Sequence, residues 1–461
     1  MNKEIINIIK EINGEKPQKP RARVVTFGCQ QNESDSEKIK GMLAEMGYGI
    51  TEDSEPCDVI IVNTCAVREH AELKAFSRTG DLKRYKDKNK DLLIGLCGCM
   101  VEQEHILEYI GESFKFVDFA FGARSLHKFP EIFYEASVNK NRFLKNETAK
   151  TGITDIIDED MPIRRDSSFK AWVSVMYGCN NFCSYCVVPY VRGRERSRSK
   201  DKILEETRGL VNSGYKDITL LGQNVNSYRD PGGPSYDFAD LLGDTVKAEG
   251  DYLIRFITSH PKDIPEKLIK LMGENEKLAN HLHLPVQAGS DRILKLMNRG
   301  YTSETYLKLI ENLKKTVKDI ALTTDIIAGF PGETAEEFKE TLNLVKEAEF
   351  DNIFPFIYSK RKNTPAEKME DTVTHKEKTE RFAELVKLQK EISAKKNKAY
   401  EGKTVRVLVE GEYKSSPGYL AGRTPAHKLA VFKGTADLTG SFANVKINEG
   451  KLHGLYGEII F

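Results

Sequence analysis

The 461-residue sequence predicts an α/β protein with an N-terminal doubly wound parallel sheet, a central partial (β/α)6 barrel and a C-terminal small antiparallel β-barrel. Two patterns predict this class. Short apolar runs alternate with amphipathic stretches over residues 21–135 and again over residues 172–356, which is typical of parallel strands covered by helices. After residue 404 the runs are short, rich in β-branched residues and separated by Gly and Pro, which is typical of a small barrel.

The N-terminal part comprises an extension and a first domain. In residues 1–20 the charges among the isoleucines predict a short amphipathic helix with a polar tail, and no secretion signal. For the first domain, residues 21–150, we expect a helix over residues 34–46. The expected strands of this domain are residues 24–27, 59–62, 92–96 and 116–119.

A polar stretch without clear periodicity, residues 138–167, is interpreted as a linker. The second domain, residues 165–395, ends in a charged helical pattern over residues 376–398. Its expected strands are residues 172–175, 218–221, 254–258, 281–285, 322–327 and 353–356. The third domain, residues 398–461, has expected strands at residues 404–409, 419–423, 428–432, 442–447 and 452–460.

Composition sets the broad class. Hydrophobic residues make up 39% and charged residues 30%, which is ordinary for a globular protein, and the net charge of +1 does not indicate a partner. No stretch approaches the roughly 20 apolar residues of a membrane helix, so we expect no membrane association and a cytoplasmic location. In that reducing compartment the eight cysteines are expected to be metal ligands or reactive thiols instead of disulfides.

Cys179, Cys183 and Cys186 form a CxxxCxxC motif directly after the first expected barrel strand. That position lies on the barrel face where active sites occur. Three thiolates on one tight loop fit three corners of a 4Fe-4S cluster, which leaves the fourth iron open to another ligand. A structural zinc site is the alternative, but it needs four ligands and no fourth Cys or His is close by in the sequence.

Cys29, Cys65 and Cys99 each close an apolar run, in VVTFGC, VIIVNTC and LLIGLCGC. The carboxyl ends of parallel strands share one edge of a sheet, so these three thiols are predicted to converge on a second cluster. Alternation directs Cys97 to the same face as Cys99, but we favour Cys99 because it lies beyond the strand. Cys57 precedes its strand and is interpreted as a small buried hydrophobe.

The chain resembles the methylthiotransferases of the radical S-adenosylmethionine (SAM) type from Arg23 to its end. The resemblance lies in FGCQQNESDSE, NTCAVRE, GCM, CNNFCSYCVVPYVRGRERSR, LLGQNVNSY, TSHP, HLPVQAGSD, LMNRGYT and DIIAGFPGET, and it is greatest to the MiaB type, which acts on tRNA. The last domain is similar to the TRAM module, a small RNA-binding barrel. Two departures are FGCQQN, where methionine is expected after the first glutamine, and FIYSKRKNTPA, which is more basic than usual.

The resemblance implies two 4Fe-4S clusters and SAM as cofactors. One cluster reduces SAM to a radical that takes hydrogen from carbon 2 of an N(6)-dimethylallyl adenine beside the anticodon, and the other holds the sulfur that is transferred. It further implies the tRNA anticodon loop as partner, an electron donor such as flavodoxin or ferredoxin, and a monomer.

Three loops after barrel strands are expected to bind SAM because of their place behind the cluster loop. The candidate residues are Gly222, Gln223, Gln287, Gly289, Ser290, Gly329 and Gly332. Ordinary strand-to-helix loop chemistry is the alternative, because Gly and polar residues are common there. His281 and His283 share a strand face, where a core or ligand-contacting role is expected instead of metal binding.

The basic stretch VRGRERSRSK follows the cluster loop and predicts RNA contact, since arginine donates to two phosphate oxygens at once. The candidate RNA-binding residues are Arg192, Arg194, Arg196, Arg198, Arg423 and Lys428. The alternatives are a solvated charge run and, for the last domain, a capping role.

Other functions remain open at this point. One alternative keeps the methylthiotransferase chemistry and replaces the substrate by threonylcarbamoyl adenosine or a ribosomal protein side chain. From another class, the protein is a non-catalytic iron–sulfur electron carrier or RNA-binding regulator, a function that leaves the SAM loops unexplained.

Overall fold

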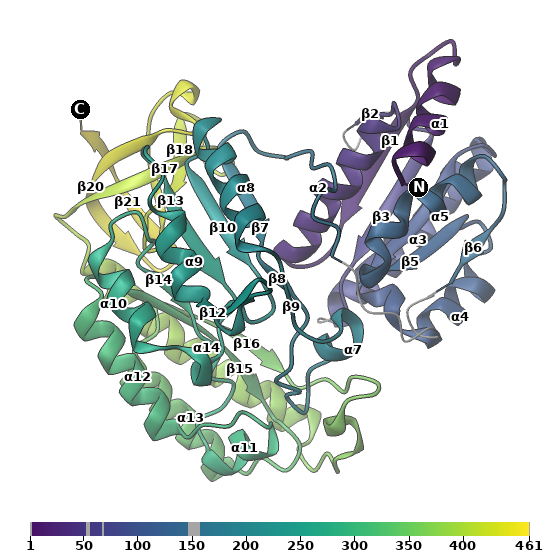
Figure 1. Cartoon of the computed structure of the whole chain (residues 1–461). Coiled ribbons are helices and arrows are strands. Elements are labelled where there is room, and N and C mark those ends of the chain that lie inside the picture. The colour runs from purple at the N-terminus through teal and green to yellow at the C-terminus, as the bar shows by residue number, and fades with distance from the viewer. Residues whose placement is uncertain (1, 52–55, 67–68, 146–156, 461) are drawn as a thin grey trace. The chain divides into compact units, whose positions relative to one another are not determined.

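The computed structural model describes residues 2–51, 56–66, 69–145 and 157–460 (Figure 1). It comprises two compact units, each described by itself below. The first contains Met1–Asp166, Tyr177–Asn180 and Cys186–Arg198, and the second contains Ser167–Met176, Asn181–Tyr185 and Ser199–Phe461. The chain therefore passes between the units several times within the region that includes the CxxxCxxC loop.

The first unit is built on a six-stranded parallel sheet with the strand order β2-β1-β3-β4-β5-β6. Its strands are β1 (Arg21–Thr26), β2 (Gly49–Ile50), β3 (Val59–Thr64), β4 (Leu93–Gly98), β5 (Phe119–Gly122) and β6 (Phe143–Leu144). Its helices are α1 (Asn2–Gly14), α2 (Gln30–Glu45), α3 (Glu69–Lys88), α4 (Glu104–Ser113), α5 (Phe129–Ser137) and α7 (Val188–Arg192).

Helices cover both faces of this sheet, as its alternating side chains require. Val59 and Ile61 of β3 pack in a core with residues of α1, α2 and α5. Ile60 and Val62, which point the other way, pack with residues of α3 and α4. The doubly wound sheet predicted from the sequence is confirmed. Its expected fourth strand was placed too early, because Phe119 pairs with Gly95 at the start of β5.

The second unit begins with six parallel strands, hydrogen-bonded in the orders β7-β10-β13 and β14-β15-β16. The strands are β7 (Lys170–Ser174), β10 (Asp217–Leu221), β13 (Leu253–Ile257), β14 (His281–His283), β15 (Ala321–Ala328) and β16 (Asn352–Ile357). All six coincide with expected strands to within a few residues, and the partial barrel is confirmed. The second unit also contains a two-stranded sheet of β11 (Arg229–Asp230) and β12 (Gly233–Asp237). Two further strands of two residues each, β8 (Met176–Tyr177) and β9 (Arg196–Ser197), pair with one another; β9 belongs to the first unit, and β8 lies at a point where the chain passes from the second unit to the first.

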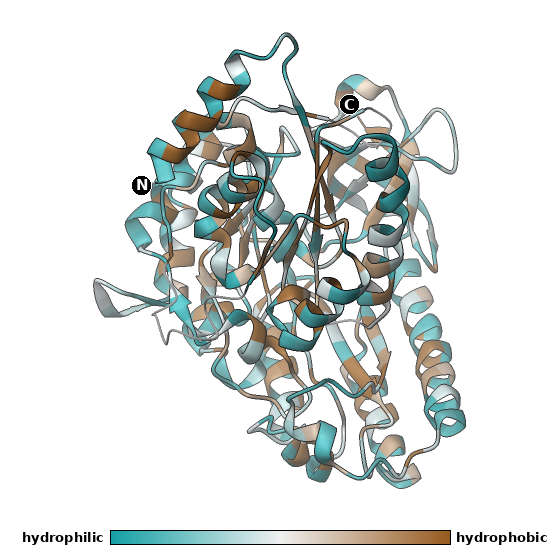
Figure 2. Ribbon diagram, turned by 90° about the vertical axis from the view of Figure 1, so that its right-hand side faces the viewer, coloured by the Kyte–Doolittle hydropathy of each residue, from teal (hydrophilic) through white to brown (hydrophobic). Residues whose placement is uncertain are grey.

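Amphipathic helices lie outside the partial barrel and bury their apolar faces against its strands. Brown and teal stretches alternate along many helices in Figure 2, as expected for helices with one apolar face. The helices around the partial barrel are α8 (Lys200–Asn212), α9 (Phe238–Thr245), α10 (Glu266–Glu274), α12 (Ser303–Thr316), α13 (Ala335–Ala348) and α14 (His375–Lys398). The short helix α11 (Asp291–Leu296) packs in a separate core with Phe330 and Tyr358. Across the described part of the chain, we find no helix long and apolar enough to span a bilayer.

The second unit ends in a closed barrel with the strand order β17-β18-β19-β21-β20. Its strands are β17 (Thr404–Glu412), β18 (Tyr419–Arg423), β19 (Leu429–Lys433), β20 (Phe442–Lys451) and β21 (Gly454–Ile460). The predicted small barrel is confirmed, although the pair β19 and β21 is parallel while the others are antiparallel. Arg255 of β13 reaches this barrel, donating to the carbonyl oxygens of Pro425 (2.8 Å) and Thr424 (3.0 Å).

Candidate active site

Cys29, Cys65 and Cys99 follow three neighbouring parallel strands, β1, β3 and β4, with Cys65 and Cys99 next to the strand end and Cys29 separated from it by two residues. The strand order reverses between β1 and β3, because β2 lies on the other side of β1. In doubly wound sheets, ligands bind outside the carboxyl ends of the strands at such a reversal. The structure thus brings the three predicted ligands to one sheet edge, at the position where this fold binds ligands.

Asn32 fastens the Cys29 loop to the strand that leads to Cys65. Its Oδ1 accepts a hydrogen bond from the backbone of Cys29 (3.4 Å), and its Nδ2 donates to Thr64 O (3.1 Å). The thiol of Cys65 donates a hydrogen bond to Cys29, which is the main reason that the pKa of Cys29 is lowered to about 6. A thiolate near neutral pH is the form that binds iron.

Cys99 lies in a different environment from Cys29. Its side chain is buried, and burial is the largest cause that raises its pKa to about 11. Arg192 of α7 donates from Nε to Cys99 Sγ at 2.9 Å, and its Nη1 lies 2.7 Å from Asp35 Oδ2. We did not expect this buried arginine beside a predicted ligand, and the local sequence offers no signal for it, since Arg192 and Cys99 are 93 residues apart.

The donor set at this edge fits an iron–sulfur group. It consists of three cysteine sulfurs from separate strand ends, with one arginine whose charge offsets that of thiolates. Within the described residues, no three His, Cys, Asp or Glu side chains are gathered as closely as the ligands of a single ion. A four-iron core distributes its cysteine ligands over separate irons, so it accommodates wider spacing.

Cys57 and Cys97 occupy core positions. Cys57 precedes β3, at the opposite end of the sheet, and packs at the edge of the core between the sheet and α3 and α4. Cys97 is buried in the core on the other face of the sheet. Burial raises the pKa of both thiols. Across all eight cysteines, which are all described, no disulfide is formed.

The cysteines of the CxxxCxxC loop are divided between the units, with Cys179 and Cys186 in the first and Cys183 in the second. In the first unit the backbone of Cys179 donates to Gly193 O at 3.1 Å. Gly178 has a φ of +79°, and a Cβ at this position would lie 2.1 Å from Arg194 O. Glycine is therefore required for the loop to pass this close to the basic segment.

Cys183 is anchored by residues of the second unit. Arg299 Nη1 donates to Cys183 Sγ at 3.3 Å, and Arg299 Nη2 donates to Pro285 O at 2.6 Å. The next residue, Ser184, donates from its backbone to Met297 O (3.0 Å). A guanidinium group thus contacts one predicted ligand in each unit, Arg299 at Cys183 and Arg192 at Cys99.

The predicted SAM-binding residues lie after β10, β14 and β15, at the carboxyl ends of these strands. Several of them have structural partners. The hydroxyl group of Ser290 donates to Glu337 (3.2 Å), and a Cβ on Gly289 would lie 2.5 Å from Thr341 Cα. Close packing therefore accounts for glycine at position 289, whereas Gly332, at φ +77°, has open space at its Cβ position.

Three buried polar side chains that we did not select lie at the ends of β10 and β13. Asn226, Ser259 and His260 each have side-chain atoms without a hydrogen-bond partner among the described residues. Burial and the charge of Arg299 lower the pKa of His260 to about 2, so its imidazole is neutral. The signal for them was available in the polar residues that directly follow strands in QNVNS and TSHP. Unpaired buried groups of this kind are ready to bind a ligand.

Three of the six predicted RNA-binding residues are unavailable for phosphate. Arg192 is committed to Cys99 and Asp35, as described above, and only 5% of it is exposed. Arg198 donates from Nε to Glu159 (2.6 Å), and Lys428 lies 2.7 Å from Asp351. Arg192 and Arg198 were assigned to RNA from the basic run after the cluster loop, and Lys428 from the basic residues of the terminal barrel, because neither pattern reveals which side chains are buried.

Arg194, Arg196 and Arg423 remain candidates for RNA contact. Arg194 is exposed, while Arg196 and Arg423 are partly buried. Arg196 donates to Arg192 O (2.9 Å), and Arg423 Nε lies 3.8 Å from Glu410. Each therefore keeps part of its guanidinium at the surface of its own unit.

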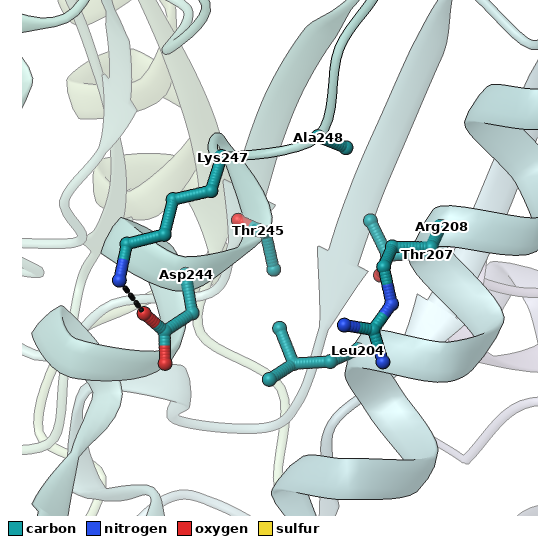
Figure 3. A pocket seen from close by; sticks show the side chains of 7 residues that line it. All are labelled: Leu204, Thr207, Arg208, Asp244, Thr245, Lys247 and Ala248. Atoms are coloured by element: carbon teal, nitrogen blue, oxygen red, sulfur yellow. Dashed lines mark hydrogen bonds and ion pairs between the residues drawn. The ribbon is translucent and has the colours of Figure 1, made fainter.

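A surface cavity of about 320 Å³ lies between α8 and α9, away from every predicted site residue (Figure 3). Its lining consists of Leu204, Thr207, Arg208, Asp244, Thr245, Lys247 and Ala248. The ion pair between Lys247 and Asp244, 2.6 Å long, is drawn at its rim. The lining of this cavity includes no cysteine and none of the unpaired polar groups described above.

Three family models match successive parts of the chain. The Radical SAM superfamily matches residues 173–345, the Uncharacterized protein family UPF0004 matches residues 21–122 and the TRAM domain matches residues 398–460. The partial barrel, the CxxxCxxC loop and the terminal barrel thus define a radical SAM protein with a TRAM domain.

Relatives that match over nearly the whole chain narrow the class. The chain is 50% identical to a tRNA-2-methylthio-N(6)-dimethylallyladenosine synthase of Acetivibrio thermocellus, over 99% of this chain and 95% of the relative. It is 49% identical to one of Clostridium tetani, over 98% and 99%. The chain belongs to the family of tRNA-2-methylthio-N(6)-dimethylallyladenosine synthases.

A solved structure shows the same fold at low identity. It is the radical S-adenosylmethionine methyltransferase TsrM from Kitasatospora setae with cobalamin and a 4Fe-4S cluster bound, with a TM-score of 0.56 and 13% identity over 76% of this chain and 74% of that chain. At this identity the likeness concerns the fold alone.

Proposed function

We propose that this chain adds a methylthio group to carbon 2 of N(6)-dimethylallyladenosine next to the anticodon of tRNA. The observation that carries the proposal is the gathering of Cys29, Cys65 and Cys99 at the strand reversal of the first unit. A radical SAM barrel alone needs one cysteine trio, whereas transfer of a sulfur group calls for a second one. The near-complete match to relatives named for this product supports the same substrate.

Two cysteine trios are the proposed cluster ligands. Cys179, Cys183 and Cys186 hold the 4Fe-4S cluster that binds SAM, and Cys29, Cys65 and Cys99 hold the second. When bound, these groups and SAM supply reductive radical chemistry and the sulfur that is transferred. The chain itself fixes the thiols, keeps Cys99 and Cys183 away from bulk water and contacts each with an arginine.

The polar groups at the ends of β10 and β13 complete the cofactor side of the proposed site. Together with Gln223, Gln287 and Gly332, the unpaired atoms of Asn226 and His260 supply hydrogen-bonding groups to SAM or to the base. Because Nδ1 of the neutral His260 imidazole accepts a hydrogen bond from Lys262 N, its Nε2 is left as a hydrogen-bond donor.

Substrate binding rests on the terminal barrel and the basic segment. Small barrels bind single-stranded RNA by backbone charge and base stacking, and Arg194, Arg196 and Arg423 offer the charge. An unpaired anticodon-loop base can be splayed out at low cost, which brings its carbon 2 edge within reach.

The remaining expectations belong to the same proposal. A flavodoxin or ferredoxin delivers the electrons, the chain works as a monomer, and the reaction takes place in the cytoplasm with tRNA. Each can be checked by reduction assays with the purified carriers, by sedimentation and by fractionation of cells.

Mass spectrometry of tRNA nucleosides from cells that lack the gene tests the substrate. We expect the 2-methylthio form of N(6)-dimethylallyladenosine to be absent, the unmethylthiolated base to accumulate, and the product to return with the intact gene. If the 2-methylthio form of threonylcarbamoyl adenosine is lost instead, that nucleoside is the substrate. Unchanged tRNA, with no 5′-deoxyadenosine formed by reduced protein and SAM, would favour the non-catalytic alternative.

A further inference from the structure

Arg192 is a buried cation at the edge of the second cysteine trio. It ends the short helix α7, and 5% of the residue is exposed. Its Nε donates to Cys99 Sγ at 2.9 Å, and its Nη1 lies 2.7 Å from Asp35 Oδ2. The charge of Arg192 also acts on Cys29, the first ligand of the trio.

A purely structural ion pair would place the guanidinium between carboxylates or backbone carbonyls. Here one of its donors is used on a sulfur atom, although sulfur is a weak acceptor unless it is a thiolate. A second donor, Nη2, is buried with no partner among the residues that the structure describes. The group therefore has more donors than the protein uses, on the side of a predicted ligand.

Asp35 completes the arrangement. Its Oδ1 accepts a hydrogen bond from Gln31 Nε2 at 3.1 Å, and the residue is buried in α2. The carboxylate balances the arginine charge in the interior, but Arg192 is the member of the pair that contacts Cys99. The positive end of the pair faces the sulfur.

We propose that Arg192 is a positioning residue that sets the reduction potential of the cluster held by Cys29, Cys65 and Cys99. Reduction adds negative charge to a cluster, and both a nearby cation and a hydrogen bond to a ligand sulfur stabilise that charge. Arg192 therefore raises the potential, and Asp35 lowers it. This inference rests on the proposed function, because it requires a cluster at the second trio.

The test uses the full-length chain with Cys179, Cys183 and Cys186 changed to alanine, so that the second cluster alone is reconstituted. Iron and sulfide are counted, and the midpoint potential is measured by redox titration followed by electron paramagnetic resonance. We compare Arg192→Gln, Asp35→Asn and Arg194→Gln. The last removes an exposed arginine two residues away and serves as the matched control.

We expect opposite shifts. Arg192→Gln removes the cation and lowers the potential, Asp35→Asn removes the anion and raises it, and Arg194→Gln leaves it unchanged. Arg192→Lys keeps the positive charge, so its midpoint potential should lie closer to that of the parent than to that of Arg192→Gln. A merely structural pair predicts no shift, or shifts of the same sign in both variants, and either result would overturn the inference.

The outcomes separate this inference from the proposed function. If the cysteine-deficient chain takes up no iron before any further change, the second cluster itself is absent and both ideas fail. If it takes up about four irons but the potential does not respond to Arg192 or Asp35, the cluster stands and the inference alone fails. Should Arg192→Gln lose its iron, the isosteric Asp35→Asn variant still decides the sign.

Discussion

Cys29 and Cys57 carry the same side chain in contrasting surroundings. Cys29 follows β1 at the reversal of strand order, and its pKa is lowered to about 6 chiefly by the hydrogen bond from Cys65. Cys57 precedes β3 and has a raised pKa because it is desolvated. Position along the strand, more than residue type, therefore distinguishes a predicted ligand from a core residue.

Alanine variants test this distinction. Cys29→Ala, Cys65→Ala and Cys99→Ala should each lower the iron content after anaerobic reconstitution from about eight per chain to about four, because one cluster loses a ligand. Each should also abolish the 2-methylthio product in tRNA. Cys57→Ala is the matched control and should keep both iron and product. Full iron in Cys65→Ala would remove that residue from the ligand set.

Glu337 is a second residue whose role follows from its contacts. It accepts hydrogen bonds from Arg292 Nε (2.6 Å), Arg292 Nη2 (2.7 Å), Thr334 N (2.8 Å) and Ser290 (3.2 Å). The Arg292 hydrogen bonds are the main reason that its pKa is lowered from 4.5 to about 2. The carboxylate thereby joins the start of α13 to the loop after β14.

Glu337→Gln should lower the free energy of unfolding by about 1–3 kcal/mol at pH 7, since charged hydrogen bonds are lost. A lowered folded-state pKa stabilises the protein fully above pH 4.5 and progressively less as the pH falls toward 2. The difference between variant and parent in urea titrations should therefore shrink over that interval. A difference independent of pH would contradict the role of the charge.

Among the elements, regular periodicity was the most informative pattern. Strands β3, β4, β10 and β15 and helix α14 lie where apolar runs and helical spacing predicted them, because each buries a continuous face. The two-residue strands β2 and β6 carry no such pattern and were not anticipated. Hydrogen bonding to an existing sheet edge decides these short strands, and no local sequence encodes that.

The basic segment after the cysteine loop shows what spacing cannot predict. Arg192, Arg194 and Arg198 follow one another within a few positions, yet only Arg194 of these three is exposed. Their burial depends on partners distant in sequence, such as Asp35 for Arg192 and Glu159 for Arg198. The cysteine positions could be predicted because strand ends are local features, whereas these partners could not.

Arg194→Gln should affect tRNA binding, whereas Arg198→Gln should affect the stability of the fold. Arg194→Gln should weaken binding to every tRNA tested and reduce the slope of log K against log salt by about 1, as expected for one lost phosphate contact. Arg198→Gln should instead lower the free energy of unfolding, because Glu159 loses its partner. Filter binding at several salt concentrations and urea titration measure the two effects. Equal salt slopes for Arg194→Gln and the parent would exclude Arg194 from the RNA surface.

In the whole molecule, buried charge joins the partial barrel to the terminal barrel within the second unit. Asp351, just before β16, lies 2.7 Å from Lys428, and Lys428 Nζ also donates to Asn397 Oδ1 at 2.9 Å. Lys396 of α14 lies 2.5 Å from the same carboxylate. One acidic residue with a buried side chain thus pairs with a buried lysine, Lys428, and with a half-buried one, Lys396.

Asp351→Asn should lower the free energy of unfolding by about 3–5 kcal/mol, because both lysines lose their counter-charge. We also expect the terminal barrel to unfold at a lower urea concentration than the partial barrel. The change can be followed by native-state hydrogen exchange in the two barrels. Glu304→Gln, which removes an exposed pair with Lys308, is the control and should have almost no effect. A single transition as stable as the parent's would contradict a role for Asp351 in joining them.

The chain returns to the first unit at residues 177–180 and 186–198, which limits where it can be truncated or joined to a relative. A shortened polypeptide ending near residue 166 would retain all six strands of the sheet but lose α7. Asp35 would then keep a buried carboxylate with no counter-ion, and Cys99 would lose its arginine donor. A chimera of two relatives joined once in the linker would therefore combine the sheet of one parent with α7 of the other. Such a chimera keeps these contacts only if both parents have the same residues at positions 35, 99 and 192.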